Sequence, residues 1–152
     1  MLYLVKLKVI CSLILVLANL SFAANCGLQK KESFRIFVSF SMPRELLASL
    51  DQQAKQIGAK LVIQGLKNNS FKETFAFAKS LGDQGIRFDI DPKAFEDFEV
   101  TQVPAFVINQ GNQYDKIVGN VSIAYALNEF ANKGDLKDKA KEYLMRLENE
   151  KK

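Results

Sequence analysis

The chain has 152 residues, a formal net charge of +4, no histidine, no tryptophan and two cysteines. This length is typical of one domain, and an apolar content of 48% is too high for a disordered chain. The absence of histidine excludes a Ser-His-Asp triad, a Cys-His nucleophile pair and a metal site built on imidazole. Two cysteines also exclude a four-thiolate zinc site.

Residues 2–23 have the three-part pattern of a secretory signal peptide. Lys6 and Lys8 supply the positive end, residues 9–17 are apolar apart from one serine, and Ser21-Phe22-Ala23 fits a small-x-small cleavage site. The apolar core is shorter than the roughly 20 residues that span a bilayer, so an uncleaved membrane anchor is the less favoured alternative.

Cleavage after Ala23 would leave Cys26 as the single cysteine, because Cys11 is lost with the peptide. A lipid anchor on Cys26 is disfavoured, because Asn25 precedes it where lipoproteins carry a small residue. The net charge falls to +2, and the excess lies from Lys133 onward, where the chain has seven basic and five acidic residues. Without a concentrated basic face, we expect no nucleic-acid partner.

After a polar arm (residues 24–33), the chain alternates strands and helices. Strands are predicted where apolar residues run together or alternate, and helices where they recur every three or four residues. The first predicted elements are a strand at Arg35–Phe40, a helix with Leu46, Leu47, Leu50, Ala54 and Ile57 on one face and Gly58 at its end, a strand at Lys60–Gln64, a helix with Phe71, Phe75, Ala78 and Leu81 inward and Gly82 at its end, and a strand at Ile86–Ile90.

Capping residues mark where these helices begin. We predict that Ser41 caps the first helix, whose first turn tolerates Pro43. Ser70 and Glu73 form a capping box for the second helix. Asp91, followed by proline, caps a short third helix that carries Phe95 and Phe98.

The last third of the chain has a different pattern. A strand at Val103–Asn109, a tight turn and a strand at Tyr114–Val118 predict a hairpin, which Gly119 ends. Two amphipathic helices follow, and the first has Ile123, Leu127, Phe130 and Ala131 on one face. The second is capped by Asp135 and has Leu136, Ala140, Tyr143, Leu144 and Leu147 on one side. Its other side is charged, with Lys139 and Glu142 among the residues predicted to be exposed. The last helix either packs on the domain or docks on a partner, and the sequence favours neither.

The order of these elements predicts the fold class. Strands separated by helices pair in parallel through right-handed crossovers, and the hairpin adds antiparallel strands. We therefore expect a three-layer α/β domain with a mixed central sheet that helices cover on both faces.

This order is similar to that of the thioredoxin fold, and three local features agree with it. Ser41-Met42-Pro43 stands where thioredoxins carry Cys-x-x-Cys, Val103-Pro104 stands where they keep a cis-proline, and Val118-Gly119 follows the hairpin in both. The resemblance implies that Pro104 is cis.

The chain more specifically resembles the TrbC family of type F conjugative pilus assembly proteins. The matching stretches are Ile36–Pro43, Leu61–Leu66, Gly85, Ile90-Asp91-Pro92, Phe95–Phe98, Val103–Val107 and Val118–Ser122. The resemblance covers residues 34–132 and implies a periplasmic, thioredoxin-like protein of a type IV secretion system. We therefore divide the chain into a signal peptide (1–23), a polar arm (24–33), a thioredoxin-like domain (34–132) and a charged amphipathic C-terminal helix (133–152).

Dithiol exchange needs two thiols, and the loop at Ser41, Met42 and Pro43 has none. The same loop, with Val103 and Pro104, is predicted to line a groove for an extended peptide, by analogy with strand addition in thioredoxin-like proteins. In the simpler alternative, Ser41 is only a helix cap and Pro104 only a turn residue.

Other candidate residues have a structural interpretation that we favour. Cys26 either forms an intermolecular disulfide or is an inert thiol in the arm. Asp89 and Asp91 could be paired carboxylates, but an outward strand position and a helix cap explain them better. The phenylalanines that we assign to the core are Phe71, Phe75, Phe95, Phe98 and Phe106, although some could form an exposed patch for a partner.

The sequence thus predicts a non-catalytic periplasmic protein that binds other conjugative transfer or pilus assembly proteins. No metal, cofactor or small-molecule substrate is expected, and membrane contact is expected only through the signal segment before cleavage. The alternative is a thiol-disulfide or chaperone-like enzyme that acts through Cys26.

Overall fold

The computed structural model describes residues 32–81 and 85–149. The predicted signal peptide, most of the polar arm with Cys26, and Gly82 lie outside these ranges. In chain order the elements are β1 (Ser33–Phe37), α2 (Arg44–Ile57), β2 (Lys60–Ile63), the 3-10 helix η1 (Lys67–Asn69), α3 (Phe71–Ser80), β3 (Phe88–Ile90), α4 (Pro92–Asp97), β4 (Ala105–Gln110), β5 (Gln113–Val118), α5 (Ile123–Lys133) and α6 (Lys137–Asn149). Within the described ranges, no helix has the length and apolar character needed to cross a membrane.

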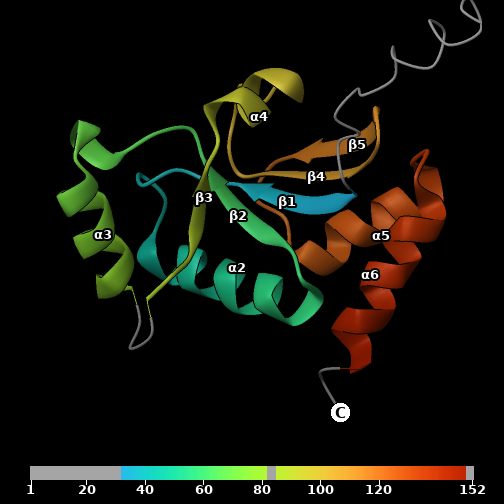
Figure 1. The fold of residues 1–152 in the computed structure, drawn as a ribbon. Helices are drawn as coiled ribbons and strands as arrows, with labels where there is room; N and C mark the ends of the chain where they lie inside the picture. The colour runs from blue at the N-terminus through green and yellow to red at the C-terminus, as the bar shows by residue number, and fades with distance from the viewer. Residues whose placement is uncertain (1–31, 82–84, 150–152) are drawn as a thin grey trace, which may run out of the picture.

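The strands form one mixed sheet in the order β3-β2-β1-β4-β5. The pairs β1–β2 and β2–β3 are parallel, whereas β1–β4 and the hairpin β4–β5 are antiparallel. Figure 1 shows α4 on one side of the sheet, α2, α5 and α6 on the other, and α3 standing beyond β3. The predicted α/β class with a mixed sheet is confirmed, and the arrangement is consistent with a thioredoxin-like fold.

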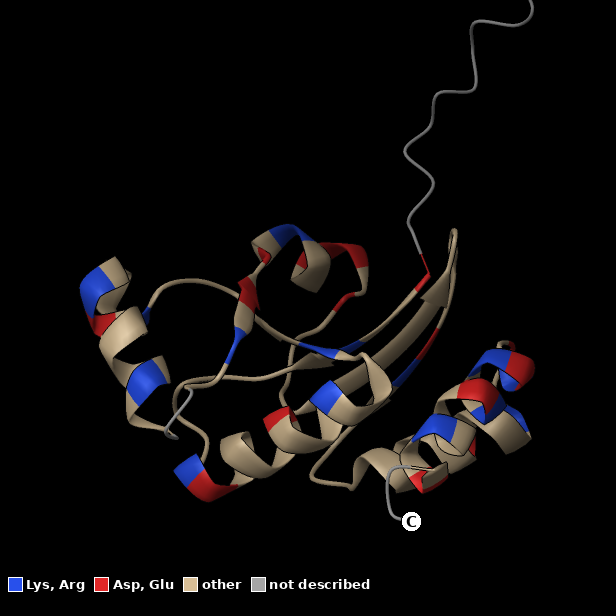
Figure 2. Ribbon diagram, turned by 60° about the horizontal axis from the view of Figure 1, so that its bottom comes forward, with Lys and Arg blue, Asp and Glu red and all other residues tan. Residues whose placement is uncertain are grey.

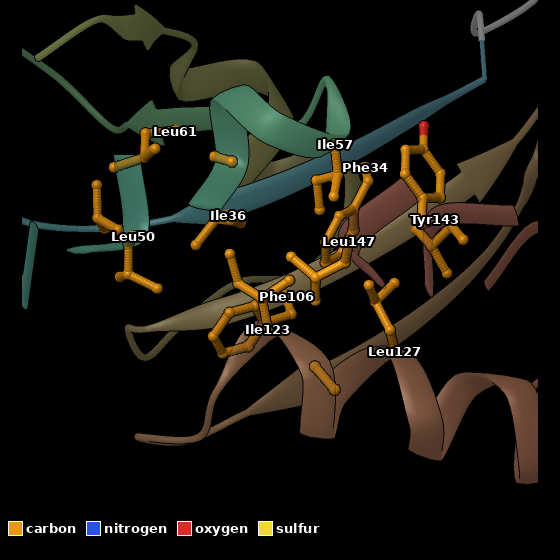
Figure 3. Close-up of a cluster of buried hydrophobic side chains, with 14 of the residues drawn as sticks. Phe34, Ile36, Leu50, Ile57, Leu61, Phe106, Ile123, Leu127, Tyr143 and Leu147 are labelled. Carbon is orange, nitrogen blue, oxygen red and sulfur yellow. The ribbon is translucent and has the colours of Figure 1, made fainter. Parts of the chain in front are cut away.

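The alternation of side chains along β1 builds a core on each face of the sheet. Phe34 and Ile36 join a large cluster with α2, α5 and α6, which Figure 3 shows in close-up. Phe37 points to the opposite face, into a smaller cluster with α4. There its ring contacts those of Phe95 and Phe98 edge-on, at centroid distances of 4.8 and 6.1 Å. Phe95, Phe98 and Phe106 are all buried, as predicted.

The last helix packs on the domain. Ala140, Tyr143 and Leu147 of α6 are buried in the large cluster, together with Leu136, which directly precedes the helix. The Tyr143 ring lies 5.4 Å from that of Phe34, and burial raises the pKa of its hydroxyl. Lys139 was predicted to be exposed, but it is only 24% exposed because it pairs with Glu32 and Glu142.

The N-terminus of α6 is held by a residue of the hairpin. The Asp115 carboxylate accepts hydrogen bonds from the amides of Asp135 and Leu136, at 2.9 and 2.8 Å. A Cβ atom at Gly134 would clash with that carboxylate and lie 2.8 Å from Phe130 O, so a larger residue there would displace the Asp115 side chain. The predicted cap at Asp135 is therefore replaced by Asp115, which comes from β5 and could not be recognised from local sequence.

Three other predictions about local structure need correction. The first strand ends at Phe37 and the second at Ile63, before the predicted boundaries. Ser41 does not cap α2, because Pro43 occupies the N-cap position and the structure shows no side-chain cap there. The capping box is half formed, since Ser70 Oγ accepts the Glu73 amide at 3.3 Å while Glu73 itself accepts a hydrogen bond from Asn68.

The prediction that Phe71 and Phe75 point inward is wrong. These side chains are 75% and 72% exposed, whereas Phe77 of the same helix is buried. The helix offers two apolar stripes, and the one with Phe77 packs against Phe40 at a centroid distance of 5.3 Å. The other stripe is left facing solvent.

Candidate functional site

A pocket of about 250 Å³ opens where β1 and β2 end. Because these strands are parallel, their carboxyl ends meet at one edge of the sheet, where ligands bind in open α/β folds. Its lining comes from the ends of both strands, from α4 and from the segment before β4: Val38, Ser39, Phe40, Ile63, Gln64, Gly65, Phe95, Val100, Thr101 and Val103. None of these residues is charged, and most are apolar.

The wall formed by α4 is firmly fixed to the sheet. Asp91 caps α4 by accepting the Ala94 amide at 2.9 Å, and its own amide donates to Ile63 O at 3.0 Å. Val100 donates to Phe95 O at 2.8 Å and so closes the turn after the helix. The pocket is therefore largely formed before any partner binds.

The Lys116 ammonium of β5 also secures this wall. It donates hydrogen bonds of 2.9 Å to the carbonyls of Phe98 and Glu99. A cation at the C-terminal end of a helix satisfies carbonyls that have no partner within the helix. The hairpin thus holds the turn that leads into the pocket segment.

The segment before β4 presents backbone groups at the pocket. The Val103–Pro104 peptide is cis, and Pro104 O accepts the Gly119 amide at 2.9 Å. Within residues 32–81 and 85–149, the structure shows no hydrogen bond to the Val103 amide or carbonyl. Unpaired backbone groups beside an apolar pocket are what an extended peptide needs for strand addition.

The loop after β1 is a closed turn. Met42 donates its amide to Ser39 O at 3.1 Å, and the Ser39 amide lies 3.4 Å from the Met42 sulfur. The hydroxyls of Ser39 and Ser41 lie 2.9 Å apart. The Ser41 hydroxyl therefore stabilises the turn, and the Met42 side chain packs against the large core cluster.

The structure thus brings only part of the predicted groove together. Val103 lines the pocket, and buried Pro104 follows it in the chain. Ser41, Met42 and Pro43 are not among the lining residues. The prediction that these five residues bind a peptide remains a prediction, and the pocket gives it a more definite location.

Most lining residues were not recognised from the sequence. Ser39, Phe40 and Gln64 are predicted to lie in strands and Phe95 in the core, and Val100 belongs to no predicted element. The usable signal was the end of each parallel strand, since residues just after those ends gather at one edge. The shorter strands of the structure move these residues into that position.

The other candidate residues of the described ranges have structural roles. Asp89 pairs with Lys60 at 2.7 Å on the surface, and Asp91 caps α4 as predicted. Residues 32–81 and 85–149 hold no cluster of three or more His, Cys, Asp or Glu that could bind a metal. Cys26 lies outside these ranges, so the structure does not describe its surroundings.

Comparisons with known proteins agree on one family. Residues 36–130 match the family described as type-F conjugative transfer system pilin assembly protein. A curated relative, the periplasmic protein TrbC of Escherichia coli (strain K12), is 34% identical over 110 residues. The match covers 71% of this chain and 52% of the relative, so the chain spans about half the relative's length. No solved structure gives a significant match.

Proposed function

Because the chain belongs to the family of type-F conjugative transfer system pilin assembly proteins, we propose that it assists pilus assembly by holding an extended segment of another transfer protein. The protein is periplasmic, as its relative is. The segment binds in the pocket at the ends of β1 and β2, and the protein performs no chemistry on it.

One observation supports this proposal above others, namely an uncharged pocket beside the unpaired backbone of Val103. The backbone of a partner strand would pair with Val103, and one of its side chains would enter the pocket. The pocket volume of about 250 Å³ lies below the roughly 300–1,000 Å³ typical of small-molecule sites. A large uncharged side chain is therefore a better occupant than a cofactor.

The pocket lining also argues for binding without catalysis. It contains no carboxylate, amine, thiol or imidazole, so it lacks a group to transfer a proton or attack a substrate. The hydroxyls of Ser39 and Thr101 have no base among the lining residues to activate them. Binding energy from apolar contact and backbone hydrogen bonds is what this lining supplies.

The pocket prediction is tested by Thr101→Arg, which places a long charged side chain at the rim. Thr101 is exposed, so the fold should tolerate the change, whereas a partner side chain would have to displace or bury the guanidinium. We expect pilus assembly in a strain that relies on this protein to fall more than about tenfold, the equivalent of 1.4 kcal/mol of binding.

The matched control is Gln102→Arg, the same change at the next residue. Gln102 is also exposed but does not line the pocket, so pilus assembly should stay near the wild-type level. Equal loss in both variants, or equal retention, would contradict the proposal that the pocket is the binding site.

A second prediction concerns the alternative of an enzyme that acts through Cys26. The variant Cys26→Ser should support pilus assembly at the wild-type level, because binding in the pocket needs no thiol. The measurement is the number of pili per cell, together with thiol–disulfide exchange by the purified protein. Measurable turnover, or loss of pili in the serine variant, would favour the enzyme.

A further inference from the structure

The exposed face of α3 is an apolar and basic surface that the pocket does not use. Phe71 and Phe75 are 75% and 72% exposed, the highest fractions among the large apolar side chains of the described residues. They are four residues apart on one helix, so their rings lie side by side along its surface. Solvent exposure of two neighbouring phenylalanines is unfavourable unless another surface covers them.

Cations without acidic partners surround these rings. Lys72 and Lys79 lie next to the phenylalanines around the helix, and neither forms an ion pair within the described part of the chain. By contrast, Lys55, Lys60 and Lys93 each contact an aspartate. Figure 2 shows blue segments along α3 and a red one, which is its acidic residue Glu73.

Two more cations extend this basic surface along the flank of α3. Arg44, at the start of α2, donates to Ser80 Oγ at 3.1 Å, and its guanidinium lies 5.5 Å from the Phe77 ring centre. The Lys67 ammonium lies 4.2 Å from the same ring centre. These contacts hold both cations near the helix, and neither forms an ion pair among the residues described, although Glu73 lines the same hollow.

The charges of the chain argue against one of its own segments as the surface that covers this face of α3. Residues 1–31 contain four lysines and no acidic residue, so the basic face would repel them. A second copy is no better suited, because none of four hollows on the described surface is acidic. The first is uncharged, the second holds three cations and two aspartates, the third has two cations and two carboxylates, and the fourth, on the flank of α3, has two cations and Glu73.

We propose that α3 docks into an apolar groove on another protein, with Asp and Glu side chains along the border of that groove. A convex helix that offers two large rings at a spacing of four residues fits a groove, as amphipathic helices do in known recognition modes. The carboxylates would pair with Lys72 and Lys79, and the groove would cover Phe71 and Phe75. This surface is separate from the pocket and does not depend on it.

The test uses the full chain in cells that assemble pili, with photoreactive benzoylphenylalanine in place of Phe75. Irradiation should link the chain to one protein of the transfer system, through an apolar groove that carries carboxylates. The double change Lys72→Glu and Lys79→Glu should lower the yield of that product by about tenfold or more, as loss of a strong interface contact does. Replacing the carboxylates of the captured groove by lysine should then restore the yield of the product with the double glutamate variant.

The control makes the same change of charge elsewhere, with Lys137→Glu and Lys141→Glu on α6, where both side chains are exposed. The yield of the crosslinked product in this control should equal the yield obtained when all lysines are unchanged. Linkage to phospholipid or nucleic acid, no linkage, equal yields in both charge variants, or failure of the exchanged groove to restore the yield would each overturn the proposal.

Discussion

Replacing Phe37 by alanine should lower the free energy of unfolding by about 3–5 kcal/mol, because the side chain is fully buried between the sheet and α4. A domain of this kind has about 5–15 kcal/mol in total, so the variant should unfold at a much lower urea concentration. Phe75→Ala removes the same atoms from a side chain that is 72% exposed, and its cost should stay within about 0.5 kcal/mol.

This pair of variants also tests how the pocket is built. Phe37 contacts Phe95, which lines the pocket, so the cavity left by Phe37→Ala should loosen that wall as well as the core. Urea unfolding curves of both variants give the comparison. A similar midpoint for Phe37→Ala and the wild type would mean that α4 is not packed on the sheet as described.

The second large effect is expected from removing α6. A chain that ends at Lys133 loses Tyr143 and Leu147, which are buried in the cluster around Phe34. Each such side chain contributes about 2–5 kcal/mol, so together they approach the whole stability of the domain. The shortened chain should therefore lose its cooperative unfolding transition in urea, followed by circular dichroism.

A milder variant keeps this prediction testable when the shortened chain cannot be purified. Leu147→Ala should cost about 2–5 kcal/mol, because Leu147 is buried. Met145→Ala on the same helix should change the stability by less than about 0.5 kcal/mol, since that side chain is 56% exposed. Unchanged stability of both variants would show that α6 is a separate docking helix.

The order of elements could be predicted because local patterns determine it. The apolar runs at β1, β2 and β4 mark strands, and the turn at Gly111 is recognisable since its φ of 60° suits glycine. Asp91 before a proline was a sufficient signal for the cap of α4. These features depend on a few neighbouring residues.

Features that depend on tertiary contacts could not be predicted in the same way. Helix α3 has apolar residues on two sides, and only the packing of Phe77 against Phe40 decides that Phe71 and Phe75 face solvent. Asp115 holds the start of α6 from 20 residues away. Whether α6 packs or docks also depended on the space that α2, α5 and β1 leave open.

In the candidate site, too, some features follow from local sequence and others depend on tertiary contacts. The resemblance to a known family located the Val103-Pro104 segment, which does border the pocket. The side chains that complete the pocket come from the ends of β1 and β2 and from α4, which lie far from Val103 in the sequence or in a different element. Strand β1 ends three residues before its predicted end and β2 one residue before, and these shorter strands place the residues that follow them at the pocket.

The most direct test of binding in the pocket is a photoreactive benzoylphenylalanine in place of Gln64, an exposed residue of the pocket lining. In cells that assemble pili, we predict a linkage to an extended, uncharged segment of another transfer protein. Thr101→Arg should abolish this linkage and Gln102→Arg should leave it unchanged. An absence of linkage at Gln64, or a linkage that persists in full with Thr101→Arg, would contradict the account.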